Sequence, residues 1–206
     1  MEKAVVFDID GVLVNSRVAN RKFHQKLIEL VGEKKVASEE IDPFFSYTLK
    51  EIIQYFYPKL TEEKLKKALV LGENLYPKFY PFVKFEKKTR KVLKLLSKNY
   101  LLGVVTGRLN ADILKHFKIR NYFKTVITFK DYSLPKPHPE PLLLALKNLN
   151  VKPENSVYIG DSELDQKAAK AVGVKFIAFK NPSLSSTYRA EKISQLPKIV
   201  EKIFKT

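Results

Sequence analysis

The sequence predicts an α/β fold in which a block of helices is inserted into a doubly wound parallel sheet. Short apolar segments alternate with helical segments over residues 86–179, a pattern typical of parallel strands that are joined by helices. One further apolar segment, Lys3–Phe7, is separated from these by a long helical stretch. We therefore predict an α/β core formed by residues 1–15 and 82–206, with an α-helical cap domain at residues 16–81.

The helices of the cap domain are predicted from apolar residues that recur at helical spacing. The first helix covers Ser16–Val31, and the second covers Leu49–Tyr57 and stops before Pro58. A third begins after Thr61, because a threonine hydroxyl can cap a helix and the two glutamates that follow it suit a first helical turn.

The core is predicted as strands and helices in alternation. After the first strand, the pattern predicts the strands 100–105, 125–129, 156–160 and 174–179 and the helices 86–98, 110–117, 139–149, 163–172 and 196–204. In such sheets ligands bind at the carboxyl ends of the strands. The polar residues that directly follow each strand are therefore the candidate site.

Composition excludes several classes of protein. The chain has 206 residues, of which 45% are apolar, and this argues against disorder. No apolar run approaches the roughly 18 residues that a membrane span needs, and the first residues, MEKAVVFDID, lack the pattern of a secretory signal. We therefore expect a soluble protein of the cytoplasm, without a membrane partner, that is a monomer or a small homo-oligomer. The absence of cysteine excludes disulfides, thiolate catalysis and cysteine-ligated zinc.

The chain is strongly basic, with 38 Lys and Arg residues against 22 Asp and Glu residues and a net charge of +16. One interpretation is a polyanionic partner such as nucleic acid. The other is a lysine- and glutamate-rich surface of the kind found in thermophile proteins. The lysines are scattered and no long arginine-rich tract occurs, which favours the second interpretation. The positive field would also attract small phosphorylated anions.

The first strand ends in two aspartates, in the segment VVFDIDGVLVNS. Residues two apart along a strand share a side, so Asp8 and Asp10 are expected near one point, with the chain turning at Gly11. A segment of the type Asp-x-Asp-Gly is also a common turn. The apolar residues on both sides favour a functional site, because they leave little reason for solvent-facing carboxylates.

Two further strands are followed by residues suited to binding phosphate. Thr106 and Gly107 follow the second strand, where they could cap the next helix or hold a phosphate oxygen. Lys136 lies between Pro135 and Pro137, which stiffen its backbone. A lysine ammonium fixed in this way is useful beside a phosphate group.

The fourth predicted strand is followed by a second pair of aspartates. Asp161 and Asp165 are four residues apart and could share one face of the first helical turn. Alternatively, Asp161 or Ser162 caps that helix. The chain has seven aspartates, and four of them are Asp8, Asp10, Asp161 and Asp165. Their concentration at two strand ends favours a site over a solubilising surface.

Together, four motifs resemble those of the haloacid dehalogenase-like hydrolase superfamily. They are DIDGVL, VVTG, KPHPEP and GDSELD, each at the end of a successive strand. The helical insertion after the first motif resembles the cap of the phosphoglycolate phosphatase and β-phosphoglucomutase branch. Val12 and Asn15 stand where threonine and aspartate are frequent in the family. The resemblance implies a Rossmann-like core with a helical cap.

The resemblance further implies a Mg²⁺-dependent phosphatase that hydrolyses small phosphomonoesters through an aspartyl-phosphate. The substrate would be phosphoglycolate, a sugar phosphate or a nucleotide. Asp8 would be the nucleophile, and Asp10 would be the general acid and then the base, which requires an environment that raises the pKa of Asp10. Mg²⁺ would be held by Asp8, Asp161 and the backbone carbonyl of Asp10.

The resemblance also assigns roles to the remaining candidates. Thr106, Gly107 and the catalytic Lys136 would bind the transferring phosphoryl group, and Asp165 would support the metal shell or Lys136. Elementary electrostatics agrees with this scheme, because a carboxylate that attacks a phosphate dianion faces strong repulsion. Mg²⁺ takes oxygen ligands and neutralises charge on both partners.

Three questions stay open at the level of the sequence. Arg17, at the start of the cap, and Arg108, after Gly107, are candidates for contacting an anionic leaving group or are surface arginines. A phosphomutase of the same family is an alternative, and it would return the phosphoryl group to the substrate. A basic nucleic-acid-binding protein with a vestigial site is an alternative of another class.

Overall fold

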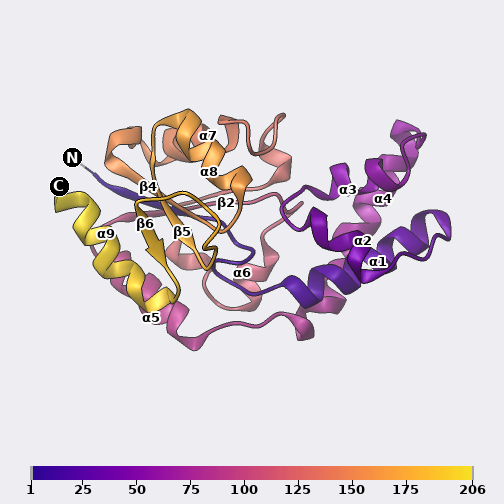
Figure 1. Ribbon diagram of the computed structural model, residues 1–206, viewed down its shortest axis with the longest axis horizontal. Helices are drawn as coiled ribbons and strands as arrows, with labels where there is room; N and C mark the ends of the chain where they lie inside the picture. The colour runs from indigo at the N-terminus through magenta and orange to yellow at the C-terminus, as the bar shows by residue number, and fades with distance from the viewer. Residues whose placement is uncertain (1, 206) are drawn as a thin grey trace.

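The computed structural model describes residues 2–205 and confirms the predicted α/β fold with a helical insertion (Figure 1). In this part of the chain six strands form one sheet in the order β3-β2-β1-β4-β5-β6, and every pair of neighbours is parallel. The strands are β1 (Ala4–Phe7), β2 (Leu101–Val105), β3 (Thr125–Ile127), β4 (Ser156–Gly160), β5 (Lys175–Phe179) and β6 (Tyr188–Ala190). The first strand of the sequence therefore lies in the middle of the sheet.

Helices cover the sheet and extend to one side of it. Within residues 2–205 the α-helices are α1 (Arg17–Gly32), α2 (Ser38–Ile41), α3 (Leu49–Phe56), α4 (Glu62–Leu75), α5 (Lys87–Leu96), α6 (Asp112–His116), α7 (Glu140–Leu149), α8 (Glu163–Val172) and α9 (Leu196–Lys205). The 3₁₀ segment η2 (Tyr76–Phe82) leads from α4 back towards the core. Figure 1 shows α1 to α4, drawn in indigo and purple, gathered beside the sheet.

The sheet is buried on both faces, and its first strand illustrates this. Val5 and Phe7 pack in one apolar cluster with side chains of α5, α6 and α9, whereas Ala4 and Val6 pack in a second cluster with side chains of α7 and α8. All four residues are fully buried, and each large apolar side chain contributes roughly 1.5–3 kcal/mol by leaving water. A parallel strand covered on both faces reads as an uninterrupted apolar run, as VVF does.

The helical insertion has apolar clusters of its own. Phe23 and Leu27 of α1 pack against Ile53 of α3 and Leu65 of α4. A further cluster joins α1 to α2 and α3. These contacts allow the inserted helices to pack as a unit, and we keep the division into residues 1–15 and 82–206 and residues 16–81 as a proposal.

The predicted elements agree with the structure to within two residues at each end, and two short elements were not predicted. The strand predicted at 125–129 ends at Ile127, because the backbone and hydroxyl of Thr128 both donate to the carboxylate of Asp131 and turn the chain into a 3₁₀ segment. The helix predicted at 110–117 is reduced to Asp112–His116. The edge strand β6 and the four-residue α2 were not predicted, since neither is long enough to show a period.

Across residues 2–205, no helix has both the length and the apolar character that crossing a membrane requires.

Candidate active site

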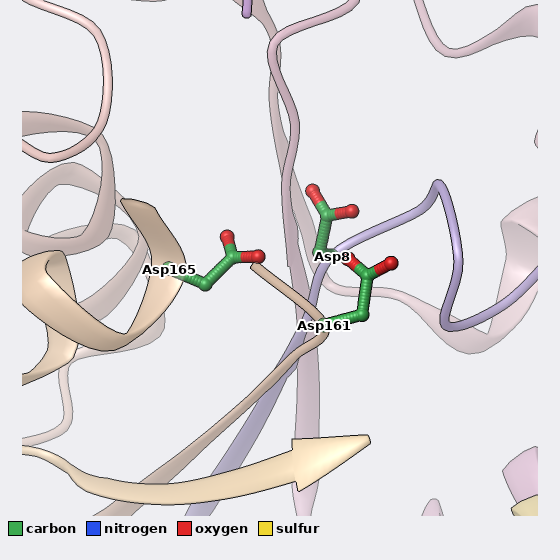
Figure 2. A group of neighbouring side chains, drawn as sticks. All are labelled: Asp8, Asp161 and Asp165. Atoms are coloured by element: carbon green, nitrogen blue, oxygen red, sulfur yellow. The ribbon is translucent and has the colours of Figure 1, made fainter. Parts of the chain in front are cut away.

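Three of the four aspartates singled out in the sequence, Asp8, Asp161 and Asp165, lie together at the carboxyl edge of the sheet (Figure 2). Asp8 directly follows β1 and Asp161 directly follows β4, and these strands are neighbours. Asp165 lies on the first turn of α8. One carboxylate oxygen from each of these three residues lies within 4.8 Å of the others. The sheet order thus brings together side chains that are more than 150 positions apart in the sequence.

Lys136 is buried in the middle of this group. Its Nζ donates to Oδ1 of Asp8 at 2.9 Å and to Oδ1 of Asp165 at 2.5 Å, and it also contacts the hydroxyl of Tyr158 at 3.2 Å. Burial opposes the ammonium charge, but the carboxylates of Asp165 and Asp8 outweigh it and raise the pKa of Lys136 well above its ordinary value. Lys136 therefore carries a fixed positive charge beside Asp8.

Asp165 is engaged by the protein on both of its oxygens. Oδ1 accepts from Lys136 and, at 2.7 Å, from the hydroxyl of Tyr158. Oδ2 accepts from the backbone and the hydroxyl of Ser162, and the hydroxyl in turn accepts from the backbone of Asp165. Ser162 is thus the cap of α8, as one of the two sequence interpretations held, and Asp165 positions Lys136 as well as completing that cap.

Protein groups neutralise the carboxylates of Asp8 and Asp161 less fully than that of Asp165. Burial, together with the charges of Asp165 and Asp10, raises the pKa of Asp8 to about 7 in spite of Lys136. Burial and the charges of Asp165, Asp8 and Asp10 raise the pKa of Asp161 well above its ordinary value. Buried carboxylates of this kind are stabilised by a cation. Carboxylate oxygens are the ligands that Mg²⁺ prefers, so the donor set fits this ion.

Gly11 allows the segment that follows β1 to lie very close to Asp161, which follows β4. Its φ is +78°, and a Cβ placed on it would lie 1.8 Å from Oδ2 of Asp161. A side chain at this position would occupy the space that the carboxylate of Asp161 takes beside Asp8.

Asp10 forms an ion pair with Arg108 that was not predicted from the sequence. Arg108 donates to it twice, from Nε to Oδ2 at 2.7 Å and from Nη2 to Oδ1 at 2.6 Å, and the hydroxyl of Ser16 also donates to Oδ1. Burial alone would raise the pKa of Asp10, but Arg108 outweighs it and lowers the pKa below its ordinary value. The expectation of a raised pKa was therefore wrong for this conformation, because periodicity gives no sign that an arginine 98 positions away faces Asp10.

The helical insertion contributes polar groups that sequence reasoning missed. The hydroxyl of Tyr76 accepts from Nη2 of Arg108 at 2.6 Å and donates to Oδ1 of Asn20 at 2.5 Å. Ser16, Asn20 and His24 are all buried polar residues. Their spacing of four is the signal that could have found them, since it places three polar side chains on one face of a helix.

All of the candidate residues line one cavity of about 620 Å³ between the sheet edge and the helical insertion. Thr106 and Gly107 line it beside Lys136, and Thr106 is buried. Arg17 lies near its rim, where its guanidinium covers the ring of Phe45 at 4.8 Å. The candidates named from the sequence and lining this cavity are Asp8, Asp10, Arg17, Thr106, Gly107, Arg108, Lys136, Asp161 and Asp165. The structure leaves none of them outside it.

Comparison with known proteins gives a consistent match over this whole arrangement. The model of the family described as haloacid dehalogenase-like hydrolase matches residues 5–179. Pyrophosphatase PpaX of Bacillus pumilus is 27% identical over 174 residues, which are 83% of this chain and 80% of that protein.

Two solved structures extend the comparison. A subfamily IA hydrolase of the same superfamily from Geobacter sulfurreducens is 32% identical, with a TM-score of 0.73 over 97% of this chain and 96% of that one. β-Phosphoglucomutase from Clostridium difficile has a TM-score of 0.86 over 100% of this chain and 98% of that one, at 23% identity, and shares the fold.

Proposed function

The chain belongs to the haloacid dehalogenase-like hydrolase family, and we propose that it is a Mg²⁺-dependent phosphatase that hydrolyses small phosphomonoesters through an aspartyl-phosphate. The family resemblance and the predicted enzyme class are thereby confirmed. The observation that carries the proposal is the cluster in which the carboxylate of Asp161 lies close to that of Asp8, while the ammonium of Lys136 pairs with Asp8. It sets an oxygen nucleophile beside both a cation site and a fixed positive charge.

Asp8 is the proposed nucleophile. Its Oδ1 is held by Lys136, which leaves Oδ2 to attack phosphorus. The attack forms a bond between Oδ2 of Asp8 and phosphorus, which gives an acyl phosphate, and breaks the bond between phosphorus and the leaving oxygen, which takes up a proton. Water then attacks the phosphorus and restores Asp8. Dividing one displacement into two in this way lowers each barrier.

The residues that would hold Mg²⁺ are Asp8, Asp161 and the backbone carbonyl of Asp10. When bound, the ion would neutralise charge on the nucleophile and on the phosphate together. Lys136 and the loop of Thr106 and Gly107 would bind the equatorial oxygens of the phosphoryl group, where charge is stabilised during transfer.

Asp10 is the proposed general acid for the leaving oxygen and then the base for water. A group with this task must be free to face the leaving oxygen and to carry a proton. The pairing of Asp10 with Arg108 has to open before that step.

The test is phosphate release from p-nitrophenyl phosphate with and without Mg²⁺. We expect release that needs Mg²⁺ and is lost in EDTA. Asp8→Asn should abolish it, and Asp10→Asn should slow turnover strongly. Full activity of Asp8→Asn would remove the nucleophile from the proposal. A panel of phosphorylated metabolites, with pyrophosphate included because of the name of the Bacillus pumilus relative, would then identify the substrate.

The same purified proteins distinguish the proposed phosphatase from two alternatives, a phosphomutase and a nucleic-acid-binding protein. A phosphomutase would convert a sugar monophosphate to its isomer with little free phosphate. A nucleic-acid-binding protein with a vestigial site would give a salt-sensitive gel shift and no phosphate release. Three further properties remain predictions: a thermophile-type surface, a cytoplasmic location, and a monomeric or small homo-oligomeric state. Thermal unfolding tests the first of these, and sedimentation tests the oligomeric state.

A further inference from the structure

We propose that Arg108 selects the substrate by changing partner, from the carboxylate of Asp10 to a second anionic group on the leaving side of the substrate. The enzyme would then favour phosphate esters and anhydrides that carry such a group. This inference rests on the proposed function and deepens it, because it names the chemical class of the leaving group.

The first observation is the geometry of the pairing in the structure. Arg108 binds both oxygens of Asp10 in a parallel fork, at 2.7 and 2.6 Å, and Ser16 occupies Oδ1 as well. Bidentate pairs of this kind are among the stronger hydrogen-bonded contacts in proteins. While the fork persists, both oxygens of Asp10 are held against the guanidinium of Arg108. Asp10 becomes available only when the guanidinium has another anion to bind.

The second observation is that Arg108 is placed to meet the substrate. It lies two positions after Thr106 in the proposed phosphate loop, and its backbone N–H donates to the Thr106 hydroxyl at 3.3 Å. It lines the same cavity as Asp8 and Lys136. Within residues 2–205, no group accepts a hydrogen bond from its Nη1. One side of the fork thus has a spare donor for an incoming carboxylate or phosphate.

The third observation concerns the wall opposite the phosphate loop. Tyr76 stacks against the guanidinium, with 4.3 Å from Cζ of Arg108 to the ring centre, and its hydroxyl binds Nη2. His24 lines the same cavity, and its buried Nδ1 has no hydrogen-bond partner among the described residues. A buried polar atom without a partner is costly. An anionic leaving group in this cavity would satisfy the spare donor of Arg108.

Selection follows from competition for one guanidinium. A leaving group with a carboxylate or phosphate competes with Asp10 for Arg108 and so frees Asp10 for proton transfer. An ester without such a group leaves the fork in place. Arg108 therefore raises the rate for substrates with an anionic leaving group and lowers it for esters without one.

The experiment compares kcat/KM for two anionic substrates, pyrophosphate and phosphoglycolate, with kcat/KM for p-nitrophenyl phosphate, all with Mg²⁺. In Arg108→Gln we expect the ratio of anionic to p-nitrophenyl substrate to fall about tenfold or more, because charged hydrogen bonds to the anion are lost. Arg108→Lys keeps the positive charge but loses the bidentate geometry, so its ratio should lie between those of the wild type and Arg108→Gln. The matched control is Arg90→Gln: Arg90 donates to the backbone carbonyl of Phe117, away from the cavity, and should keep the wild-type ratio.

Inhibition gives a second readout that does not depend on turnover. Methylenediphosphonate carries two anionic groups and methylphosphonate carries one. Arg108→Gln should weaken inhibition by the first about tenfold while leaving inhibition by the second close to wild type. A purely structural role of Arg108 would weaken both.

Three outcomes overturn the inference. They are an equal loss of kcat/KM for all substrates in Arg108→Gln, an unchanged ratio in that variant, and a fall of the ratio in Arg17→Gln instead. If the wild-type protein releases no phosphate from any of these compounds, the proposed function fails as well, and the two failures are thereby distinguished.

Discussion

Lys136 and Asp8 form a buried ion pair at the centre of the site, with 2.9 Å between Nζ and Oδ1. The two residues lie 128 positions apart. Asp165 binds the same ammonium from the other side at 2.5 Å, so one positive charge serves two buried carboxylates. The pair holds the proposed nucleophile in place and reduces the cost of burying it.

Removing this charge is predicted to affect stability as well as activity. Lys136→Met leaves two buried carboxylates without their partner, and breaking a buried pair in this way costs about 3–5 kcal/mol of unfolding free energy. Urea denaturation measures it. Lys167→Met is the control: Lys167 pairs with Glu163 at an exposed site, with side chains 58% and 68% exposed, so its change should stay within about 0.5 kcal/mol. Equal midpoints for the two variants would contradict the prediction.

Binding of Mg²⁺ is predicted to tighten as the pH rises. Without metal the pKa of Asp8 is about 7, so a proton competes with the ion below that pH and is released on binding. For one such group the ionised fraction rises from about 9% at pH 6 to about 91% at pH 8, which makes the apparent affinity about tenfold higher. Calorimetry in buffers of different ionisation enthalpy measures both the affinity and the released proton. Asp161→Asn should lose the binding, and a pH-independent affinity would argue against the site.

His24 is predicted to make the protein less stable in acid. Burial lowers the pKa of His24 from 6.5 to about 4, so the unfolded chain binds this proton more readily than the folded chain does. Unfolding free energy must then fall as the pH drops from about 6.5 towards 4, by up to about 3 kcal/mol.

The carboxylates titrate in the same range, so the measurement is a difference between two proteins. The unfolding free energy of the wild type minus that of His24→Gln, taken at several pH values, isolates the histidine. A difference that stays constant from pH 7 to pH 4 would show that His24 is not buried in its neutral form.

Two glycines of almost equal backbone conformation should respond differently to alanine. Gly11 has a φ of +78° and lies against Asp161, whereas Gly173 has a φ of +79° with open space around its Cβ position. Gly173→Ala should cost about 1 kcal/mol of stability, the strain of a left-handed residue, and keep its phosphate release. Gly11→Ala should lose the same stability through backbone strain. It should also lose Mg²⁺ binding, because the added methyl group displaces the carboxylate of Asp161. If both variants release phosphate equally well, Gly11 does not shape the metal site.

The sequence predicted the sheet and its carboxyl edge well, because the apolar strands are buried on both faces and Asp8 and Asp161 directly follow β1 and β4. Asp8, Asp161 and Lys136 meet where strand order and chain turns require. Asp8 and Asp161 are found by their place after a strand and Lys136 by its flanking prolines, and neither signal needs knowledge of side-chain packing.

What could not be predicted depends on contacts between distant segments. Tyr158 reads as an apolar strand residue, yet its hydroxyl binds Asp165. Arg108 reads as one basic residue among many, yet it binds Asp10 across 98 positions. The short strand β6 is specified by its pairing with β5 rather than by a pattern of its own.

The central position of β1 also determines when the site can form during translation. β1 leaves the ribosome before β2 and β4, yet its ladder joins Val6 to Gly103 and to Tyr158. At roughly 5–20 residues per second, β1 waits roughly 8–30 s for β4 to be synthesised. Helices α1 to α4 need only partners close in sequence, so they can fold during that time. An apolar strand without neighbours is meanwhile a target for chaperones, and Asp8 gains Asp161 and Asp165 as neighbours only once β4 and α8 have been made.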